Sequence, residues 1–298
     1  MGAVRYFSGA WKRRRYFEGW YFKQQAEAET VALIPALHVD GQGRASASLQ
    51  VVAGTFAQSV PFDAKTFSAE RNALRIRLGD SVFSDRGCVL NVDAPGCAVR
   101  GNLSFGPLTP PNGDIMGPFR FVPGMECRHS VFSLRHRVDG EIAINGRRIA
   151  FENASGYIEG DRGASFPRRY LWTQCSWGEN SLMLSVAEIP YLGMRFTGLT
   201  GFVFFEGREH RVATYLNAKL PMIADGAAVV RQGPLALSVE LLEGGGHELL
   251  APEGGGMTRI IRENICCRAR YRCRIGGKPL FEFESDRASF EDDWTMPD

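Results

Sequence analysis

The chain has 298 residues, of which 44% are hydrophobic and 23% are charged, the ordinary composition of a globular protein. At roughly 100 to 200 residues per domain, this length predicts about two domains or one large β-architecture. Lys and Arg number 35 against 33 Asp and Glu, so the net charge is only +2. Because a dedicated nucleic-acid-binding protein usually carries a stronger basic balance or a basic stripe, we expect no nucleic-acid partner.

The longest apolar stretches, such as residues 31–37 and 201–205, fall far short of the roughly 20 residues that span a bilayer. The N-terminal residues show neither a secretory apolar run nor a myristoylation motif, so we expect a cytoplasmic protein. Trp11 begins a short basic and aromatic cluster that ends at Arg15. This cluster is either simply solvated or makes a transient contact with an anionic membrane surface.

The seven cysteines include no Cys-x-x-Cys pair. Adjacent Cys266 and Cys267 would point to opposite faces of a strand, so they could not grip one metal ion together. We therefore expect reduced thiols. The chain also lacks a Gly-x-Ser-x-Gly elbow, a Walker phosphate loop and a dinucleotide-binding glycine motif, so no cofactor is expected.

Apolar residues alternate with other residues along much of the chain, as in Leu-Arg-Ile-Arg-Leu at residues 74–78. This period of two is typical of half-buried strands, and no segment shows a sustained helical period. Glycine dipeptides then mark the expected turns. These are Asp139-Gly140, Asn145-Gly146, Glu206-Gly207 and Gly276-Gly277. The first two predict a three-stranded meander over residues 132–151.

So many strands predict an all-β chain of antiparallel sheets, closed into one or two barrels or sandwiches. The chief irregular stretch, residues 106–124, contains five prolines and is typical of a functional loop or a linker. Basic residues lead into an aromatic strand at residues 13–22 and again at 168–177, which is compatible with a duplicated domain. We expect two β-domains, residues 1–152 and 153–298.

The first segment that could carry chemistry is Tyr-Phe-Glu-Gly-Trp-Tyr-Phe-Lys at residues 16–23. In a strand, Glu18 and Trp20 share one face, whereas Tyr21 and Lys23 share the other. If Trp20 points inward, so does Glu18, and a buried carboxylate must find a basic partner or raise its pKa. A structural Glu–Arg pair is favoured over catalysis by Glu18.

A second segment, Met-Glu-Cys-Arg-His, ends at His129. The Glu126-x-x-His129 spacing is that of di-iron ligands on helices, but the following residues alternate as a strand, so no metal is expected. In extended chain Cys127 and His129 share a face opposite to Arg128, so Glu126 is expected to work with Arg128. A strand-end ion pair beside a satisfied histidine explains the segment equally well.

A third segment places Tyr157, Glu159 and Asp161 on one face of a strand, shortly before Arg168 and Trp172. Two nearby carboxylates push their pKa values apart, which would leave one of them protonated as a general acid. The alternative is an acidic turn paired with the following arginines. The convergence of a tyrosine, two acids, basic residues and a tryptophan favours a functional site.

Taken together, these segments resemble the tocopherol cyclase family, in the same order along almost the whole chain. The matching signatures are Glu18-Gly19-Trp20-Tyr21-Phe22-Lys23, Pro123-Gly124-Met125-Glu126-Cys127 with His129, Gly156-Tyr157-Ile158-Glu159 with Asp161, Gly163 and Ser165-Phe166-Pro167, Ala213-Thr214-Tyr215, and Gly255-Gly256-Met257 with Arg259 and Ile261-Arg262-Glu263. The resemblance implies two lipocalin-like or calycin-like β-barrels and a cofactor-independent ring closure on a prenylated hydroquinone or related lipid.

The sequence departs from the family pattern at Gly160, Arg162 and Arg128, which suggests a more polar or differently shaped ligand. The candidates for proton transfer are Asp161, Glu159 and Glu126, with Asp161 as the preferred donor. The candidates for substrate binding are Glu18, Trp20, Tyr21, His129, Tyr157, Arg168 and Trp172. Two alternatives to the cyclase stay open: a non-catalytic carrier of a hydrophobic lipid, and hydration or isomerisation of an apolar substrate.

Overall fold

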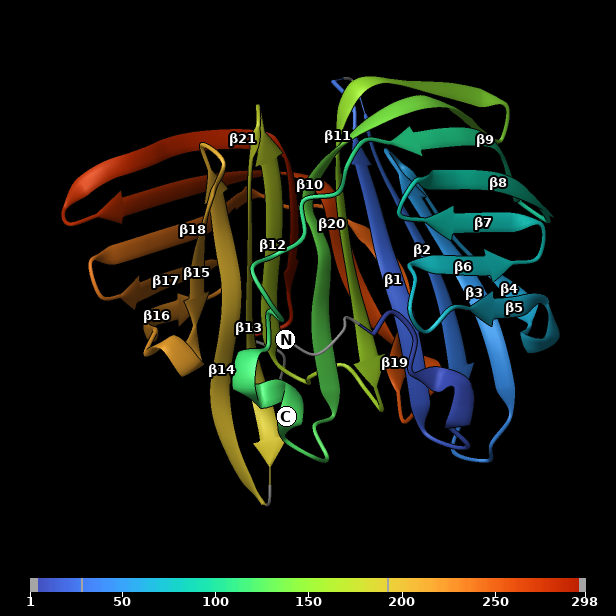
Figure 1. Cartoon of the computed structure of the whole chain (residues 1–298), viewed down its shortest axis with the longest axis horizontal. Coiled ribbons are helices and arrows are strands. Elements are labelled where there is room, and N and C mark those ends of the chain that lie inside the picture. Colours follow the sequence, from blue (N-terminus) through green and yellow to red (C-terminus); the bar gives the residue numbers. More distant parts are fainter. Residues whose placement is uncertain (1–4, 28, 192, 295–298) are drawn as a thin grey trace. The chain divides into compact units, whose positions relative to one another are not determined.

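The computed structural model describes residues 5–27, 29–191 and 193–294 and consists almost entirely of antiparallel strands (Figure 1). Its helical segments are single turns of 3₁₀ helix: η1 (Gly9–Trp11), η2 (Ala64–Thr66), η3 (Gly117–Phe121) and η4 (Thr214–Leu216). None of the helices in this part of the chain is long and apolar enough to cross a membrane. The predicted all-β class is confirmed.

The first sheet contains eleven strands in the order β4-β3-β2-β1-β11-β10-β9-β8-β7-β6-β5. Its strands are β1 (Tyr16–Gln25), β2 (Thr30–Val39), β3 (Ala45–Ala53), β4 (Phe56–Asp63), β5 (Phe67–Ala69), β6 (Arg75–Leu78), β7 (Ser81–Ser84), β8 (Gly87–Ala94), β9 (Cys97–Phe105), β10 (Cys127–Ile144) and β11 (Arg147–Gly163). Figure 1 shows β5–β9 running across the direction of β1 and β2, so this sheet bends over its own core.

The second sheet contains ten strands, nine of them in the order β15-β14-β13-β12-β21-β20-β18-β17-β16, with β19 paired to β20. Its strands are β12 (Tyr170–Trp177), β13 (Asn180–Tyr191), β14 (Met194–Phe205), β15 (Arg208–Ala213), β16 (Lys219–Ala224), β17 (Ala227–Gln232), β18 (Leu235–Glu243), β19 (His247–Glu253), β20 (Gly256–Ile275) and β21 (Lys278–Asp292).

The expected closed, lipocalin-like barrels are not found. The pairing path of the first sheet ends at β4 and β5, that of the second ends at β15 and β16, and no pairing among the described strands joins these ends. Each sheet instead covers a large apolar cluster of its own. In the first sheet this cluster takes residues from both bent halves, such as Leu49 on β3 and Val99 on β9, so curvature alone buries the core without closure.

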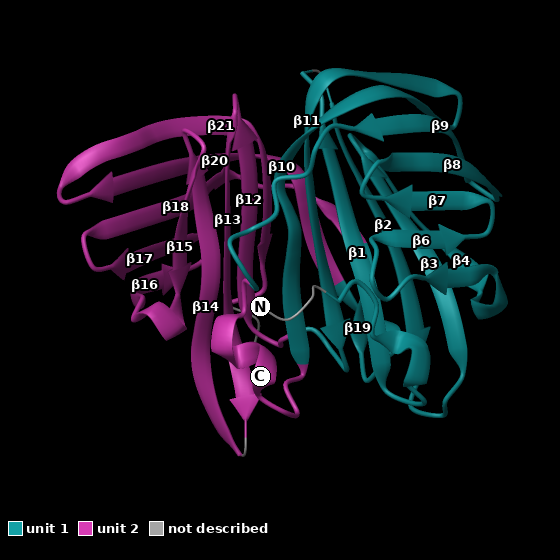
Figure 2. Ribbon diagram, in the orientation of Figure 1, with its two compact units in different colours: residues 1–114, 127–166, 249–260 teal, residues 115–126, 167–248, 261–298 magenta. Residues whose placement is uncertain are grey.

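The chain divides into two compact units that do not follow the sequence in two blocks (Figure 2). Unit 1 contains residues 1–114, 127–166 and 249–260, and unit 2 contains residues 115–126, 167–248 and 261–298. Each unit thus includes a segment that is remote in sequence from the rest of it. The predicted division between residues 152 and 153 falls inside β11, which pairs with β1 as far as Gly163.

Three of the four predicted glycine turns are confirmed. Asn145-Gly146 joins β10 to β11, Glu206-Gly207 joins β14 to β15, and Gly276-Gly277 joins β20 to β21. The turn predicted at Asp139-Gly140 is wrong, because β10 continues through it with a shift of register. Gly140 has φ +128°, and a Cβ there would lie 2.3 Å from the Asn102 oxygen, so the glycine serves a β-bulge with close backbone approach rather than a turn.

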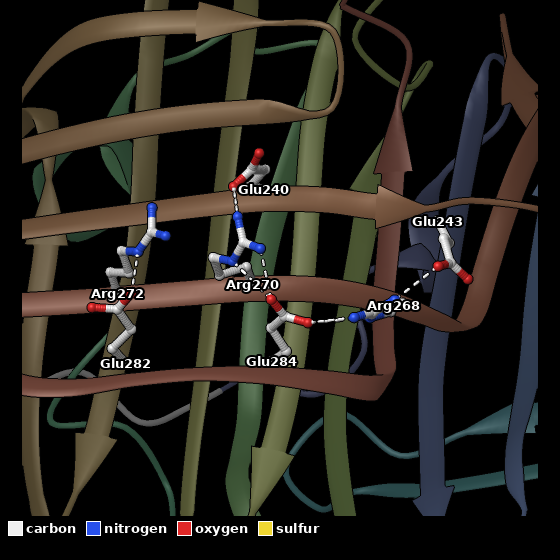
Figure 3. Close-up of polar contacts among 7 residues, drawn as sticks. All are labelled: Glu240, Glu243, Arg268, Arg270, Arg272, Glu282 and Glu284. Carbon is white, nitrogen blue, oxygen red and sulfur yellow. Dashed lines mark hydrogen bonds and ion pairs between the residues drawn. The ribbon is translucent and has the colours of Figure 1, made fainter.

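Alternation also explains the outer face of β20 in unit 2. Arg268, Arg270 and Arg272 point to solvent, whereas the intervening residues point into the apolar cluster. Arg270 bridges Glu240 on β18 and Glu284 on β21, with N–O distances of 3.0 and 2.6 Å (Figure 3). These ion pairs are exposed, so they fix strand register more than they add stability.

β1 lies near the middle of the first sheet and is buried on both faces. Trp20 is 1% exposed and packs in the apolar cluster beside Phe67, and its indole N–H donates a hydrogen bond to the Tyr6 oxygen at 3.2 Å. Its neighbour on the same face, Glu18, is also buried. The predicted sharing of one face by Glu18 and Trp20 is confirmed.

We predict that Trp20→Ala lowers the free energy of unfolding by about 3 to 5 kcal/mol, the usual cost of truncating a large core aromatic. Denaturant unfolding followed by circular dichroism measures the change. Trp11→Ala is the control, because Trp11 is 79% exposed and its loss should change stability by no more than about 0.5 kcal/mol. Equal stability of the two variants would contradict the central placement of β1.

Candidate functional site: a histidine between two carboxylates

Three neighbouring strands of unit 1 carry the candidate site. Asp161 on β11 pairs with Gly19 on β1 on one side and with His129 on β10 on the other. Two residues along β11, Glu159 pairs with Tyr21. Because paired residues and residues two apart share a face of a sheet, these side chains all emerge on one side. This is the face opposite to Glu18 and Trp20.

The side chain of His129 lies between the two predicted catalytic carboxylates. Its Nδ1 is 3.1 Å from Asp161 Oδ1, and its Nε2 is 3.3 Å from Glu159 Oε2. The first contact has hydrogen-bond geometry, whereas the second is an ion-pair contact without that alignment. The side chains of His129 and Glu159 are 10% and 7% exposed, and that of Asp161 is 22% exposed. Asp161 is therefore the more accessible carboxylate.

Two further groups complete the cluster. The Tyr157 hydroxyl donates a hydrogen bond of 2.5 Å to Glu159 Oε2, and the Cys127 thiol donates a weaker one of 3.5 Å to Asp161 Oδ1. We define Cys127, His129, Tyr157, Glu159 and Asp161 as the His129 cluster. Three of its members were predicted as candidates on one face of β11, and the structure brings His129 to them from β10.

The two carboxylates determine the charge of His129. Burial alone would lower its pKa, but the attraction of Glu159 and Asp161 outweighs burial and raises the pKa well above 6.5. Burial, with Glu159 close by, raises the pKa of Tyr157 well above 10. The position of His129 between the two carboxyl groups therefore favours the protonated, positively charged ring.

The same geometry could hold a metal ion, since ligand atoms of His129, Glu159 and Asp161 all lie within 4.8 Å of one another. The sequence had pointed only to Glu126 and His129 as a spacing of metal ligands. A ligating imidazole, however, needs one nitrogen with a free lone pair, whereas here each nitrogen faces a carboxylate. The arrangement fits a protonated ring better than a metal ligand.

Glu18 and Trp20 are not part of the His129 cluster, because they lie on the other face of β1. The Glu18 carboxylate accepts hydrogen bonds from the Ser8 backbone N–H at 2.8 Å and from the Tyr16 hydroxyl at 2.7 Å. Burial outweighs these bonds and raises its pKa. Glu18 thus has the raised pKa predicted for a buried carboxylate, although the charge of Arg162 opposes that shift, and the core position of Glu18 and Trp20 argues for a structural role.

The remaining predicted site residues belong to unit 2. Trp172 is buried in β12, where it pairs with Ser185 and Glu291, and Arg168 is exposed just before that strand. Glu126 lies in the segment before β10. Their roles in substrate binding or proton transfer remain predictions, whereas Tyr21, with Glu159 beside it in the register, lies on the face of the His129 cluster.

Known proteins match this chain in two ways. Residues 103–195 match the family model described as Tocopherol cyclase-like, a segment that includes β10, β11 and every member of the His129 cluster. The resemblance drawn from the sequence is confirmed over this segment. No curated protein sequence matches the chain.

Solved structures show the same fold at low sequence identity. The structure of CghA with Sch210972 is 12% identical, with a TM-score of 0.61, covering 93% of this chain and 88% of CghA. An AttH candidate from Nitrosomonas europaea is also 12% identical, with a TM-score of 0.54, covering 94% of this chain and 93% of that protein. The two-sheet architecture is thus shared across nearly the full length.

We predict that His129 makes stability depend on pH above neutrality. Its folded-state pKa exceeds the value of about 6.5 expected in the unfolded chain, so its contribution is complete below pH 6.5 and is lost as the pH rises through the folded-state pKa. The difference in unfolding free energy between wild type and His129→Gln should therefore fall above pH 6.5, by at most about 1.4 kcal/mol per pH unit.

His38→Gln is the control for this titration. Burial lowers the folded-state pKa of His38 to about 4. The ionisation of His38 therefore makes stability depend on pH only below about 6.5. If the unfolding free energies of His129→Gln and wild type changed in parallel from pH 6.5 to 9, the imidazolium between the two carboxylates would be refuted.

Proposed function

We propose that this chain is a tocopherol cyclase-like enzyme that closes a ring on a prenylated hydroquinone or related terpenoid lipid, giving a chromanol-type product without a cofactor. The observation that carries the proposal is a buried, proton-rich cluster within the segment that matches the Tocopherol cyclase-like family. The likeness to CghA, which was crystallised with Sch210972, adds support that this fold accommodates a small organic ligand.

The reaction is an isomerisation that requires one proton to enter and one to leave. An acid protonates the trisubstituted alkene, forming a C–H bond and a tertiary cation. The phenol oxygen then attacks that carbon, forming the C–O bond, and loses its proton to a base. A carboxylic acid is too weak for this step in water, so the alkene must be held against it in a site from which water is excluded.

In this proposal Asp161 is the donor, because it is the most accessible carboxyl of the cluster and contacts His129 through a hydrogen bond. His129 supplies the proton to Asp161 across the 3.1 Å contact and recovers the phenol proton after ring closure. Glu159, held by Tyr157, orients the ring of His129 and stabilises its positive charge before and after the proton transfer. The aromatic face of Tyr21 would stabilise the developing cation.

A non-catalytic lipid carrier is the second candidate function. It is supported by the departures from the family pattern at Arg128 and Arg162, which suggest a more polar or differently shaped ligand. In a carrier, the same cluster would orient the polar head group of the lipid without turnover. Ligands that copurify with the protein, identified by mass spectrometry, separate the two, because a quinol or chromanol favours the enzyme and a fatty acid or phospholipid favours the carrier.

The proposal also places the protein in the cytoplasm, with transient contact to an anionic membrane surface through the segment from Trp11 to Arg15. A hydrophobic substrate would be collected from such a surface. The high exposure of Trp11 supports this part of the proposal, because an indole with neighbouring basic residues suits the membrane–water interface.

We predict that Asp161→Asn lowers the turnover of a prenylated hydroquinone by roughly 100-fold or more while the affinity for it stays within a few-fold. The amide preserves shape and polarity but has no acidic proton. Chromanol formation is followed by chromatography and affinity by calorimetry. Asp93→Asn is the control, since Asp93 has a side chain 77% exposed on β8 and should leave both unchanged.

A cyclisation rate that survives Asp161→Asn would transfer the acid role to Glu159 or Glu126 and refute the mechanism at its central residue. A wild-type protein that binds the hydroquinone but never converts it would support the carrier.

A further inference from the structure

Gly19 is the one residue of β1 that is half-buried rather than buried. All nine other residues of this ten-residue strand are buried, on both of its faces. Gly19 pairs with Asp161, which is itself partly accessible. The least buried residue of this central strand thus lies beside the proposed acid.

Neither backbone conformation nor packing explains a glycine at this position. Gly19 is absent from the glycines with positive φ, so its backbone suits other residues. A Cβ built on it would meet only the Ala36 Cβ at 3.4 Å and the Pro35 oxygen at 3.9 Å, which are ordinary contacts. Glycine in a strand interior is less stable than alanine, so the sequence keeps an unfavourable residue where a larger one fits.

Gly160 on β11 pairs with Trp20, the residue after Gly19, and has no room for a side chain. A Cβ on Gly160 would lie 2.8 Å from the Gly19 backbone oxygen and 3.0 Å from the Phe132 ring. Close packing requires that glycine, whereas at Gly19 a methyl group would fit with ordinary contacts. The contrast suggests a ligand-related reason for Gly19.

Aromatic side chains limit the open space along the strand. Phe17 and Tyr21 lie two residues before and after Gly19 on the same face, so their Cα atoms are roughly 13 Å apart. Phe17 is fixed by an edge-on contact with Phe166, with 5.4 Å between ring centroids. Across the strands, the space is bounded by Ala36 on β2 and by Asp161 on β11.

We propose that this notch over Gly19 binds the hydroxylated aromatic ring of the ligand, with its hydroxyl directed to Asp161 and His129 and its faces toward Phe17 and Tyr21. The inference rests on the proposed function for the identity of the ring, and on the contacts of Gly19 for its place in the sheet. A phenol suits the site because it offers a flat apolar body and one hydroxyl that can both donate to a carboxylate and accept from an imidazolium.

The test replaces Gly19 with side chains that fill the notch and measures binding separately from turnover. 4-Butylphenol is the probe, butylbenzene is the matched probe without the hydroxyl, and isothermal calorimetry gives the dissociation constants. For Gly19→Val we expect the dissociation constant of 4-butylphenol to rise about tenfold or more, and for Gly19→Ala by a smaller factor, because the added methyl groups occupy the space of the ring. Butylbenzene should bind wild type about tenfold more weakly than the phenol.

Folding is checked by the melting temperature, which Gly19→Ala should leave unchanged or raise. Gly41→Ala and Gly41→Val are the matched controls, because a Cβ at Gly41 meets nothing within 4 Å in the turn between β2 and β3. Both control variants should bind the phenol as wild type does.

The outcomes separate the notch from the enzyme. Loss of phenol binding in Gly19→Val, without any cyclisation by wild type, would keep the notch as a lipid head-group site and overturn the proposed reaction. Equal phenol binding by wild type, Gly19→Ala and Gly19→Val would overturn the notch, even if wild type cyclises a hydroquinone. Absence of phenol binding to wild type would also overturn it.

Discussion

A charged imidazole between two carboxylates is the interaction on which the arrangement of the central strands depends. Buried charges are tolerated only when partners compensate them, and His129 meets that requirement on β10 only if β11 presents Glu159 and Asp161 at the correct register. A slip of one residue between these strands would turn both carboxylates to the opposite face and leave the imidazolium unpaired. The electrostatic contact and the strand register therefore stabilise each other.

The central strand β1 separates two environments of different character. One face packs Trp20 and Phe22 into the apolar cluster of unit 1, and the buried Glu18, whose pKa is raised, shares that face. The other face presents Tyr21 and the buried Lys23 beside Glu159 and Tyr157. The parity of a position in β1 therefore decides whether its side chain packs toward the apolar cluster or toward the His129 cluster.

Strand parity could be read from the sequence, but the pairing of strands could not. Alternation placed Tyr157, Glu159 and Asp161 together, and it separated Glu18 from Tyr21. The partner of Asp161 was not predictable, because three register shifts interrupt the pairing of β10 with β11. One of them is the bulge at Gly140, which has the sequence of a turn. The assignment of residues 249–260 to unit 1 has no local signal either, since it rests on tertiary contacts such as the hydrogen bonds between the Gln50 side chain and the Leu250 backbone.

The two arginines that depart from the tocopherol cyclase pattern lie on the same face of the central strands as Glu18. Arg162 pairs with Glu18 on one side and with Arg128 on the other, so both arginines have the parity of Glu18 and not that of Asp161. Arg162 donates a hydrogen bond of 3.0 Å to Ser130 on that side of the sheet. Its positive charge acts on Glu18, where it opposes the effect of burial on the carboxyl pKa. The family differences at these two arginines therefore change the surroundings of Glu18 and lie on the face opposite to the His129 cluster.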